Sequence, residues 1–312
     1  MENERKTLTR RMKELAISHG FSQIGIAQAG KLSEEGRRLD QWLERKYQAS
    51  MEWMQRTREK RIDPRAVLPS AKSVVSLSLN YYTEAQHSED PAAGKISRYA
   101  WGDDYHEPLS HRIESLLTTL RLEHPDIEAR SYVDTGPVME KAWAARAGLG
   151  WIGKHTNLIT KEFGSWIFLG EIFLNVELEF DTPIEDFCGT CTACIEHCPT
   201  QAIVEPYVLD SQKCISYLTI EHRGSIQVEL AAQFDRWIYG CDICQDVCPW
   251  NRFQKGTGET AFQPRVENIA PKLTELAAMS QEEFSQRFHK SPIKRTKHQG
   301  LLRNVQTALK AR

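Results

Sequence analysis

The sequence predicts an α+β protein with three parts along the chain. Helical and strand-like hydrophobic patterns alternate over residues 1–180, which predicts one mixed domain. All eight cysteines fall within residues 181–255, and residues 256–312 return to a helical pattern. With 312 residues and 40% hydrophobic content, the chain is long enough for two or three domains with real cores.

The elements of the first part follow from periodicity and from turn residues. Helical spacing predicts helices, and alternating or continuous apolar runs predict strands, in this order: helix 5–19, strand 21–27, helix 33–60, strand 73–81, helix 106–122, strand 127–133 and strand 165–174. Proline suits the first turn of a helix, so we also expect a helix from Pro137 to about Ala147. The run 165–174 is apolar on both faces, which predicts a buried strand.

The cysteine spacing is the most specific pattern in the chain. It reads Cys188-x2-Cys191-x2-Cys194-x3-Cys198-Pro199, then Cys214, then Cys241-x2-Cys244-x3-Cys248-Pro249. A C-x2-C-x2-C loop supplies three thiolates to one 4Fe–4S cluster, and the cysteine before the proline ligates the other cluster. One cluster would therefore take Cys188, Cys191, Cys194 and Cys248, and the other would take Cys198, Cys214, Cys241 and Cys244.

Other uses of eight cysteines fit the spacing less well. Cys214 lies far before Cys241, which departs from the compact pattern, but an inserted loop leaves the count at four plus four. Two structural zinc sites remain a weaker alternative, because the C-x2-C-x2-C triplet suits a cube better than a tetrahedral ion. A disulfide framework belongs to small secreted domains, and the charged N-terminus does not resemble a signal peptide.

Charge and hydropathy limit the partners and the compartment. A net charge of −2 argues against a protein that binds nucleic acid over its whole surface. After Glu283, however, the chain has basic residues and no acid, which predicts a local contact with a polyanion or a solvated helix face. No apolar run approaches the roughly 20 residues of a membrane span, so we expect no membrane contact and a cytoplasmic location.

Three polar segments of the first part suggest a ligand site. They are Lys95–His106 (KISRYAWGDDYH), Val133–Glu140 (VDTGPVME) and Gly148–Asn157 (GLGWIGKHTN). The glycines of the last segment would let the backbone approach a ligand closely, although they could be ordinary turn residues. Asp134 ends a strand and could project into a cleft, although it could also cap the following helix. Neither a dinucleotide-binding fingerprint nor a P-loop is present.

The segments SRYAWGDDYH and VDTGPVMEKAWAARAGLGWIGKHTNLI, together with the double cluster run, resemble the epoxyqueuosine reductases over about residues 10–310. The resemblance implies a nitroreductase-like cobalamin-binding domain over 1–180, a ferredoxin-like domain with two 4Fe–4S clusters over 181–255, and a short helical start of a HEAT-like module over 256–312. It also implies reduction of the epoxide of epoxyqueuosine in a tRNA anticodon loop to queuosine. A monomer supplied by a low-potential electron donor is expected.

The resemblance further implies roles for individual residues. Asp134 matches the family's proton donor, and nearby motif residues would contact cobalamin. Those residues are Arg56, Thr57, Ser97, Asp134, Lys154, His155, Thr156, Asn157, Ser216 and Asp242. The candidate tRNA contacts are Arg223, Lys290, Lys294, Arg295, Lys297 and Arg303. The alternatives are another corrinoid reductase, similar to reductive dehalogenases, and a cobalamin-free electron carrier of the ferredoxin type.

Overall fold

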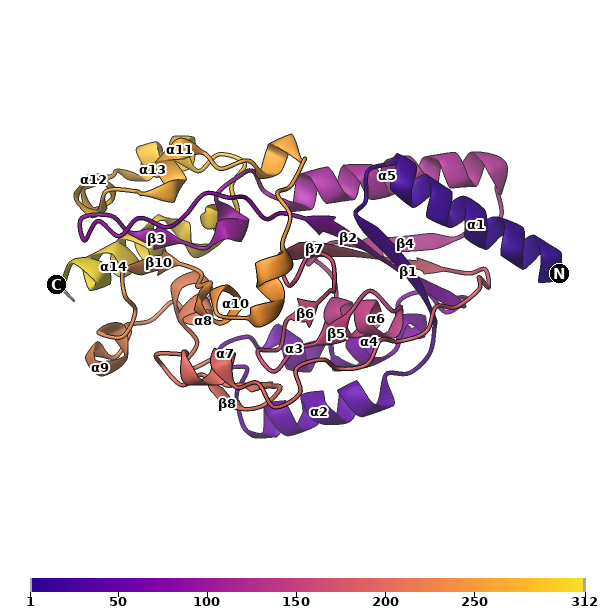
Figure 1. Cartoon of the computed structure of the whole chain (residues 1–312), viewed down its shortest axis with the longest axis horizontal. Coiled ribbons are helices and arrows are strands. Elements are labelled where there is room, and N and C mark those ends of the chain that lie inside the picture. Colours follow the sequence, from indigo (N-terminus) through magenta and orange to yellow (C-terminus); the bar gives the residue numbers. More distant parts are fainter. Residues whose placement is uncertain (1, 311–312) are drawn as a thin grey trace.

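A four-stranded antiparallel sheet forms the centre of the first part of the chain (Figure 1). The computed structural model describes residues 2–310. The strands lie in the order β1 (Gln23–Gln28), β2 (Ser73–Asn80), β7 (Ile167–Leu174) and β4 (Ala129–Tyr132). Every residue of β2 is buried, because β2 lies inside the sheet and both of its faces are covered.

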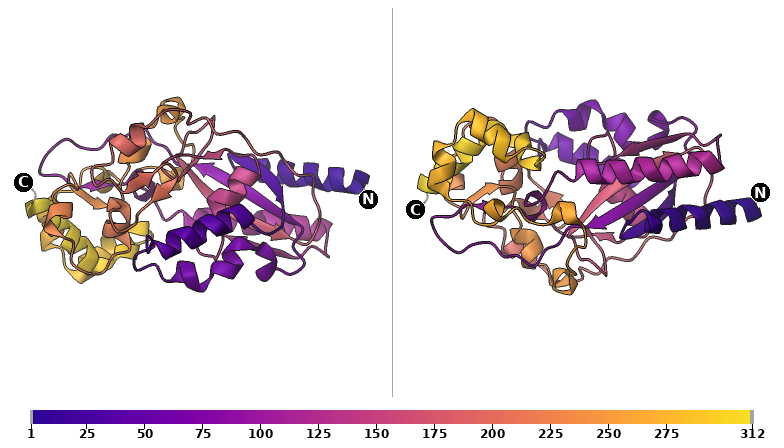
Figure 2. Two further views of the ribbon diagram at one scale, coloured as in Figure 1. Left: turned by 90° about the horizontal axis from the view of Figure 1, so that it is seen from below. Right: turned by 90° about the horizontal axis from the view of Figure 1, so that it is seen from above.

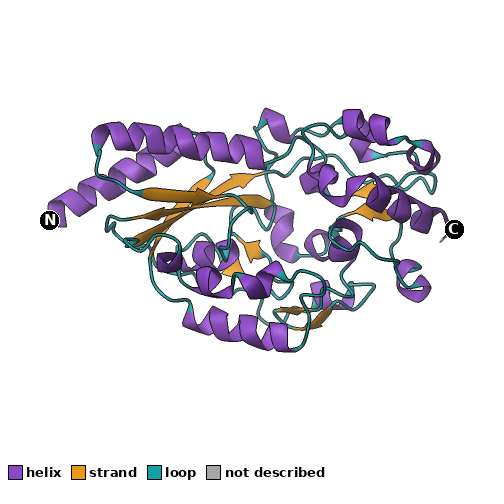
Figure 3. Cartoon of the chain, turned by 180° about the vertical axis from the view of Figure 1, so that it is seen from behind, coloured by secondary structure: helices purple, strands orange, loops and turns teal. Residues whose placement is uncertain are grey.

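Helices cover both faces of this sheet (Figure 3). On one face lie α1 (Glu2–Ser18) and α5 (His106–Glu123), whose Met12 and Ile113 are fully buried with the inward residues of β2 and β7. On the other face lies α6 (Glu140–Arg146), whose Trp143 packs in a second core. The strand and helix predictions over 5–19, 21–27, 73–81, 106–122, 127–133 and 165–174 are confirmed to within a few residues.

The single helix predicted over 33–60 is wrong. The chain forms three helices there: α2 (Ser33–Glu44), α3 (Trp53–Arg56) and α4 (Arg58–Ile62). Lys46 and Ala49 adopt positive φ angles of 58° and 52°, which an α-helix does not tolerate. The break carries no glycine or proline, so the sequence gives no warning of it.

The helix predicted to begin at Pro137 is also wrong at its start. Residues 133–137 form a bend, and α6 begins only at Glu140, with Met139 before it. Asp134 has a φ of +50°, and this left-handed residue turns the chain out of β4 before helical geometry can begin. The α6 helix has no side-chain cap, so the reading of Asp134 as a helix cap is wrong too.

The cysteine-rich part consists of short helices and one hairpin, which long loops connect. Its helices are α7 (Ala193–Glu196), α8 (Ile215–Ile220), α9 (Val228–Ala231) and α10 (Ile243–Asp246). Strands β8 (Ile203–Glu205) and β9 (Val208–Leu209) form a hairpin, as do β5 (Trp151–Ile152) and β6 (Leu158–Ile159) in the preceding part. Short 3-10 turns occupy Pro64–Ala66, Arg98–Ala100, Pro249–Phe253, Thr260–Phe262 and Pro292–Thr296.

The C-terminal part is helical, as predicted. It contains α11 (Val266–Ile269), α12 (Leu273–Ala278), α13 (Gln281–Arg287) and α14 (Lys297–Lys310). These helices pack against β10 (Trp237–Tyr239), which pairs in parallel with β3 (Lys95–Ile96) from the first part. The three parts therefore interlock, with α1 and α14 at opposite ends of the molecule (Figure 2). No helix within residues 2–310 is long and apolar enough to cross a bilayer.

Candidate active site

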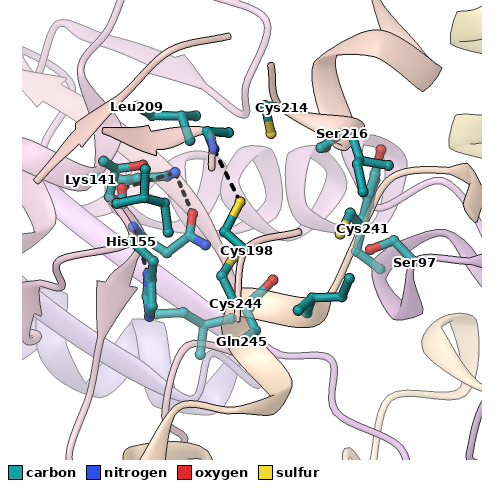
Figure 4. A pocket seen from close by; sticks show the side chains of 18 of the residues that line it. Ser97, Lys141, His155, Cys198, Leu209, Cys214, Ser216, Cys241, Cys244 and Gln245 are labelled. Atoms are coloured by element: carbon teal, nitrogen blue, oxygen red, sulfur yellow. Dashed lines mark hydrogen bonds between the residues drawn. The ribbon is translucent and has the colours of Figure 1, made fainter. Parts of the chain in front are cut away.

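A cavity of about 460 Å³ lies where one end of the sheet meets the cysteine-rich part. The bend after β4 contributes Asp134, α6 contributes Glu140 and Lys141, and the loop between β5 and β6 contributes His155 and Asn157. Figure 4 shows Lys141 and His155 on one side of the cavity, Ser97 and Ser216 on the other, and Cys198 and Cys244 between them. Residues far apart in the sequence thus share one cavity.

The eight thiols separate into two groups, and only one group faces the cavity. Cys194 interacts electrostatically with Cys248, Cys188 and Cys191, whereas Cys244 interacts most strongly with Cys214 and Cys198 and then with Cys194 of the first group. Four thiols line the cavity, namely Cys198, Cys214, Cys241 and Cys244. The four thiols that line the cavity are the second ligand set expected from the spacing, whereas the division of all eight into two cluster sites stays a prediction.

The eight thiols are not joined in disulfides, so all of them can act as metal ligands. All eight cysteines are free, and burial with the neighbouring thiols raises the pKa of Cys194 to about 11. Within residues 2–310, no three His, Cys, Asp or Glu side chains converge closely enough to hold one metal ion. A tetrahedral zinc site needs sulfur atoms at about 2.3 Å from a common centre, whereas a cube spreads its four ligands over a larger object.

Asp134 is held in its bend by two short hydrogen bonds. Its backbone N–H donates to Glu140 Oε1 at 2.6 Å, and Tyr105 OH donates to its Oδ2 at 2.6 Å. Burial, and then the nearby Asp134, raise the pKa of Tyr105 well above its usual value, so this hydroxyl stays protonated and can donate. Gly136 completes the bend, because a Cβ there would lie 2.0 Å from the ring of Tyr132.

The two residues that open α6 are chemically unusual. Burial, and then the nearby Asp134, raise the pKa of Glu140 to about 8, so its carboxyl is largely neutral at pH 7. Enclosure lowers the pKa of the Lys141 ammonium, which donates to Asn157 Oδ1 at 2.7 Å. One wall of the cavity therefore offers a largely neutral carboxyl and, beside it, an ammonium with a lowered pKa.

The same wall has a polar atom without a partner. His155 is 4% exposed, and its Nδ1 accepts the backbone N–H of Asn157 at 3.2 Å, which assigns the ring proton to Nε2. Nε2 has no hydrogen-bond partner among residues 2–310. Burial lowers the pKa of His155 to about 4, so the ring is a neutral donor at pH 7. An unpaired buried donor of this kind, beside Lys141 and Asn157, suits a bound molecule with polar side groups.

Comparison with known proteins assigns the chain to a family. Two family models match it: a 4Fe–4S double cluster binding domain over residues 187–251, and "Epoxyqueuosine reductase QueG, DUF1730" over residues 61–135. A Synechocystis sp. epoxyqueuosine reductase is 50% identical over 290 residues, which span 92% of this chain and all of that protein. The Escherichia coli enzyme is 42% identical over 306 residues, covering 97% of this chain and 80% of its own.

The chain belongs to the epoxyqueuosine reductase family. Its structure agrees: a solved epoxyqueuosine reductase with an epoxyqueuosine-modified tRNA stem loop superposes with a TM-score of 0.90 at 34% identity, over 97% of this chain and 81% of that one. The Bacillus subtilis epoxyqueuosine reductase superposes with a TM-score of 0.88 at 32% identity and the same coverage.

The ten residues matched to family cobalamin motifs divide into two sets. Six line the cavity: Ser97, Asp134, His155, Thr156, Asn157 and Ser216. The other four, Arg56, Thr57, Lys154 and Asp242, do not line it. Arg56 is exposed on α3, and Thr57 accepts a hydrogen bond from Arg61 Nε at 2.9 Å.

The remaining two connect the first part of the chain with the cysteine-rich part. Lys154 Nζ donates to the carbonyls of Gly189 and Cys191, at 2.6 and 2.9 Å, so it supports the first cysteine loop. Asp242 is fully buried and accepts bonds from Ser97 Oγ and from the backbone N–H of Arg98. Burial, followed by Asp246, raises its pKa to about 7.

The basic residues proposed for tRNA binding are not equally available. Arg223 and Arg303 donate to backbone carbonyls, including those of Arg295 and Leu218, so both hold the fold together. Arg295 forms a two-pronged ion pair with Glu221 at 2.8 and 2.9 Å, and Lys290 lies 3.3 Å from Glu107. Lys294 and Lys297 are exposed and form no ion pair with residues 2–310. The tRNA role of all six stays a prediction.

Two features of the site were not foreseen. Tyr105 and Glu140 lie inside the motifs that carried the resemblance, but no role was expected for them. The glycines of GLGWIGKHTN allow the chain to pack on itself: a Cβ on Gly150 would lie 2.0 Å from the Ile159 carbonyl oxygen. The signal available in the sequence was a charged pair, Glu140-Lys141, separated by two residues from the D-T-G-P turn.

Proposed function

We propose that this chain reduces the epoxide of epoxyqueuosine, in the anticodon loop of a tRNA, to the alkene of queuosine. Electrons would pass through two 4Fe–4S clusters to cobalamin bound in the cavity. The observation that carries the proposal is the arrangement of one cavity, in which Asp134 lies on one wall and four of the eight thiols on another. The epoxyqueuosine reductases that align with nearly the whole chain support the same reaction.

The reaction requires two electrons and two protons. An epoxide that becomes an alkene loses its oxygen as one water molecule, so two C–O bonds break and one C=C bond forms. Cobalamin, when bound, would supply a strongly reducing centre for this step. Asp134 would give a proton to the departing oxygen, and general-acid help of this kind is worth about 10²–10⁴-fold.

The surrounding residues would prepare Asp134 and hold the cofactor. Glu140 and Tyr105 would fix the carboxyl through the backbone and side-chain bonds already described. Lys141, His155, Asn157 and Ser216 would bind polar groups of the corrin periphery, since each lines the cavity. The Bacillus subtilis structure is described as having an aspartate-bearing catalytic loop swung out of the active site, which supports a catalytic role for the bend at Asp134.

We assign the parts of the chain accordingly. Residues 1–180 would form a nitroreductase-like cobalamin domain, residues 181–255 a ferredoxin-like domain, and residues 256–312 the start of a HEAT-like module. The solved complex of a relative with a tRNA stem loop supports tRNA as the substrate. Lys294 and Lys297, two exposed lysines of the basic segment, would contact its phosphates. The chain would act as a monomer supplied by a low-potential electron donor.

An anaerobic turnover assay tests the proposal. The chain is loaded with iron, sulfide and cobalamin, reduced with dithionite, and incubated with tRNA that carries epoxyqueuosine. Mass spectrometry of the digested nucleosides should show that epoxyqueuosine loses one oxygen atom. Unchanged epoxyqueuosine, in the presence of a chain that has bound both kinds of cofactor, would reject the function.

A further inference from the structure

A buried indole lies against two cysteines of the first expected ligand set. Trp151, on β5, is 2% exposed and forms a small buried core with Ile159 and Cys248, against which Cys188 packs. We call the first expected set, which consists of Cys188, Cys191, Cys194 and Cys248, the Cys188 set. Because Trp151 packs with two of its members, the ring would lie beside a cluster that this set holds.

Two other aromatic rings fix the orientation of this indole. The ring centroids of Phe187 and Trp250 lie 5.2 and 4.9 Å from that of Trp151, and both contacts are edge-to-face. On the opposite strand of the hairpin, Ile159 pairs with Trp151. A ring packed in this way has little freedom to redirect its N–H.

The indole nitrogen of Trp151 is an unpaired donor. Trp151 Nε1 has no hydrogen-bond partner among residues 2–310. A buried indole N–H usually has a partner, because it gives up its hydrogen bond with water on folding. The neighbouring Trp250 Nε1 has one, the carbonyl of Phe187 at 3.3 Å. Three other indoles also bury an unpaired Nε1, so this feature alone does not identify a ligand; they are Trp101, Trp166 and Trp237.

A second observation relates this indole to a cysteine sulfur. Burial raises the pKa of the Cys188 thiol, and the backbone N–H of Lys154 and then the indole of Trp151 act against burial as donors to the sulfur. The indole contact falls short of a complete hydrogen bond, since Nε1 has no partner. A neutral thiol is a weak acceptor, whereas the sulfur atoms of a bound cluster carry negative charge and attract an N–H strongly.

The hairpin that carries Trp151 also holds the first cysteine loop. Lys154 follows β5, and its Nζ donates to the carbonyls of Gly189 and Cys191 at 2.6 and 2.9 Å. Within that loop, the Cys191 N–H donates to the Cys188 carbonyl at 3.0 Å. The hairpin from the first part of the chain therefore forms one wall beside the Cys188 set, and Trp151 is held at a fixed place in that wall.

We propose that Trp151 donates its indole N–H to a sulfur of the cluster on the Cys188 set and thereby raises the reduction potential of that cluster. The inference rests on the proposed function, because it assumes that this set holds a 4Fe–4S cluster. Reduction adds one electron to the cluster and changes no covalent bond, so the added negative charge strengthens the N–H···S hydrogen bond. Hydrogen bonds to the sulfurs are among the features that set cluster potentials.

The test measures the two cluster midpoint potentials of the fully loaded enzyme, by anaerobic redox titration followed with EPR spectroscopy. Trp151→Phe removes the N–H and keeps an aromatic ring in the core. Trp250→Phe is the matched control, because it changes a neighbouring indole whose N–H is already bound by the Phe187 carbonyl. Iron content is measured for all three proteins.

Trp151→Phe should make one cluster harder to reduce. We expect its equilibrium constant for one-electron reduction to fall by about tenfold, which corresponds to a midpoint about 59 mV more negative. The other cluster should keep its wild-type midpoint, because the indole packs with cysteines of the Cys188 set alone among the two expected sets. Trp250→Phe should shift neither midpoint.

Pulsed EPR gives a second readout that does not depend on Trp151→Phe retaining its iron. The wild-type chain and Trp250→Phe are produced with tryptophan that carries nitrogen-15 only at the indole nitrogen. Both reduced proteins should show hyperfine coupling between a cluster and one indole nitrogen. Since Trp250→Phe lacks the neighbouring indole, a coupling that persists in this variant identifies Trp151 as the donor.

Three results would overturn the inference. The first is wild-type midpoints in Trp151→Phe at full iron content. The second is an equal shift in Trp151→Phe and Trp250→Phe, which would assign the effect to ring packing. The third is a wild-type cluster signal without coupling to an indole nitrogen. Failure of a wild-type chain with both clusters and cobalamin bound to reduce epoxyqueuosine would instead reject the proposed reaction and leave the potential shift in place, so the two failures are distinguishable.

Discussion

Glu140 Oε1 accepts the backbone N–H of Asp134 at 2.6 Å, and this bond joins the first residue of α6 to the bend that precedes it. Asp134 has a φ of +50°, which costs a non-glycine residue about 1 kcal/mol relative to the ordinary regions. The bond to Glu140 and the bond from Tyr105 offset that cost and direct the carboxyl into the cavity. Glu140 and Tyr105 thus position the proposed proton donor, and the proposed reaction gives neither of them a chemical step of its own.

Replacing the carboxyl of Asp134 removes the proton while keeping the shape. Asp134→Asn should reduce turnover by about 10²–10⁴-fold, because the amide cannot act as a general acid at neutral pH. Iron and corrinoid contents should equal those of the wild-type chain. Nucleoside analysis after a fixed anaerobic incubation measures the effect, and a wild-type rate in this variant would remove the role of Asp134.

Two substitutions at Glu140 separate its hydrogen bond from its charge. Glu140→Gln retains an acceptor for the Asp134 N–H and should keep turnover within a few-fold of wild type at pH 7, where Glu140 is already largely neutral. Glu140→Ala releases the bend and should lower kcat by about tenfold, the worth of one hydrogen bond of about 1.4 kcal/mol. Equal kcat values for the alanine and glutamine variants would contradict the positioning role.

The raised pKa of Glu140 predicts how stability depends on pH. Burial, and then Asp134, raise this pKa from 4.5 to about 8 in the folded chain, so folding favours the protonated form. The stability that the neutral carboxyl contributes is fully present below about pH 4.5 and is lost as the pH rises through about 8. The thermal unfolding temperature of the wild-type chain should therefore decrease relative to that of Glu140→Gln as the pH rises from 5 to 9. The exposed Glu229→Gln serves as control, and a constant gap between Glu140→Gln and wild type would contradict the prediction.

The basic segment predicts opposite outcomes for two kinds of residue. Arg303 donates to the carbonyls of Leu218, His222 and Gly224, so Arg303→Ala should lower the free energy of unfolding by about 2–3 kcal/mol, as measured by urea denaturation. Lys294→Ala and Lys297→Ala should leave that free energy within about 0.5 kcal/mol.

The same two lysines should instead affect tRNA. Each lysine substitution should weaken tRNA binding and reduce the slope of log affinity against log salt by slightly less than one. Filter binding over a range of salt concentrations provides this slope. A slope identical to that of the wild-type chain in both variants would remove Lys294 and Lys297 from the interface.

The structure agrees best with those predictions that depend on residues close together in the sequence. The cysteine sets were predicted from ligand spacing within short loops, and the four cysteines of the second set do line one cavity. The strands β2 and β7 follow from continuous apolar runs. The break at Lys46 and Ala49 could not be foreseen, because ordinary residues adopt the left-handed conformation there.

The site depends more on tertiary contacts. Tyr105 reaches Asp134 only because α5, which begins directly after Tyr105, packs against β4 and β7, and no local pattern encodes that contact. Arg223 and Arg303 were likewise predicted to contact tRNA because of their charge. Their guanidinium groups instead donate hydrogen bonds to backbone carbonyls of other segments. Glu171 lies within an apolar run, yet its fully buried carboxyl accepts a bond from Ser76 Oγ at 2.6 Å.

The account depends on cofactor binding in the cavity that Asp134 shares with the Cys198 group. The most direct test is corrinoid retention through gel filtration by Ser216→Phe, whose ring would project into that cavity. We predict that the wild-type chain retains one corrinoid per chain, whereas Ser216→Phe retains its iron and loses the corrinoid. A variant that keeps both at wild-type levels would place the cofactor elsewhere and contradict the account.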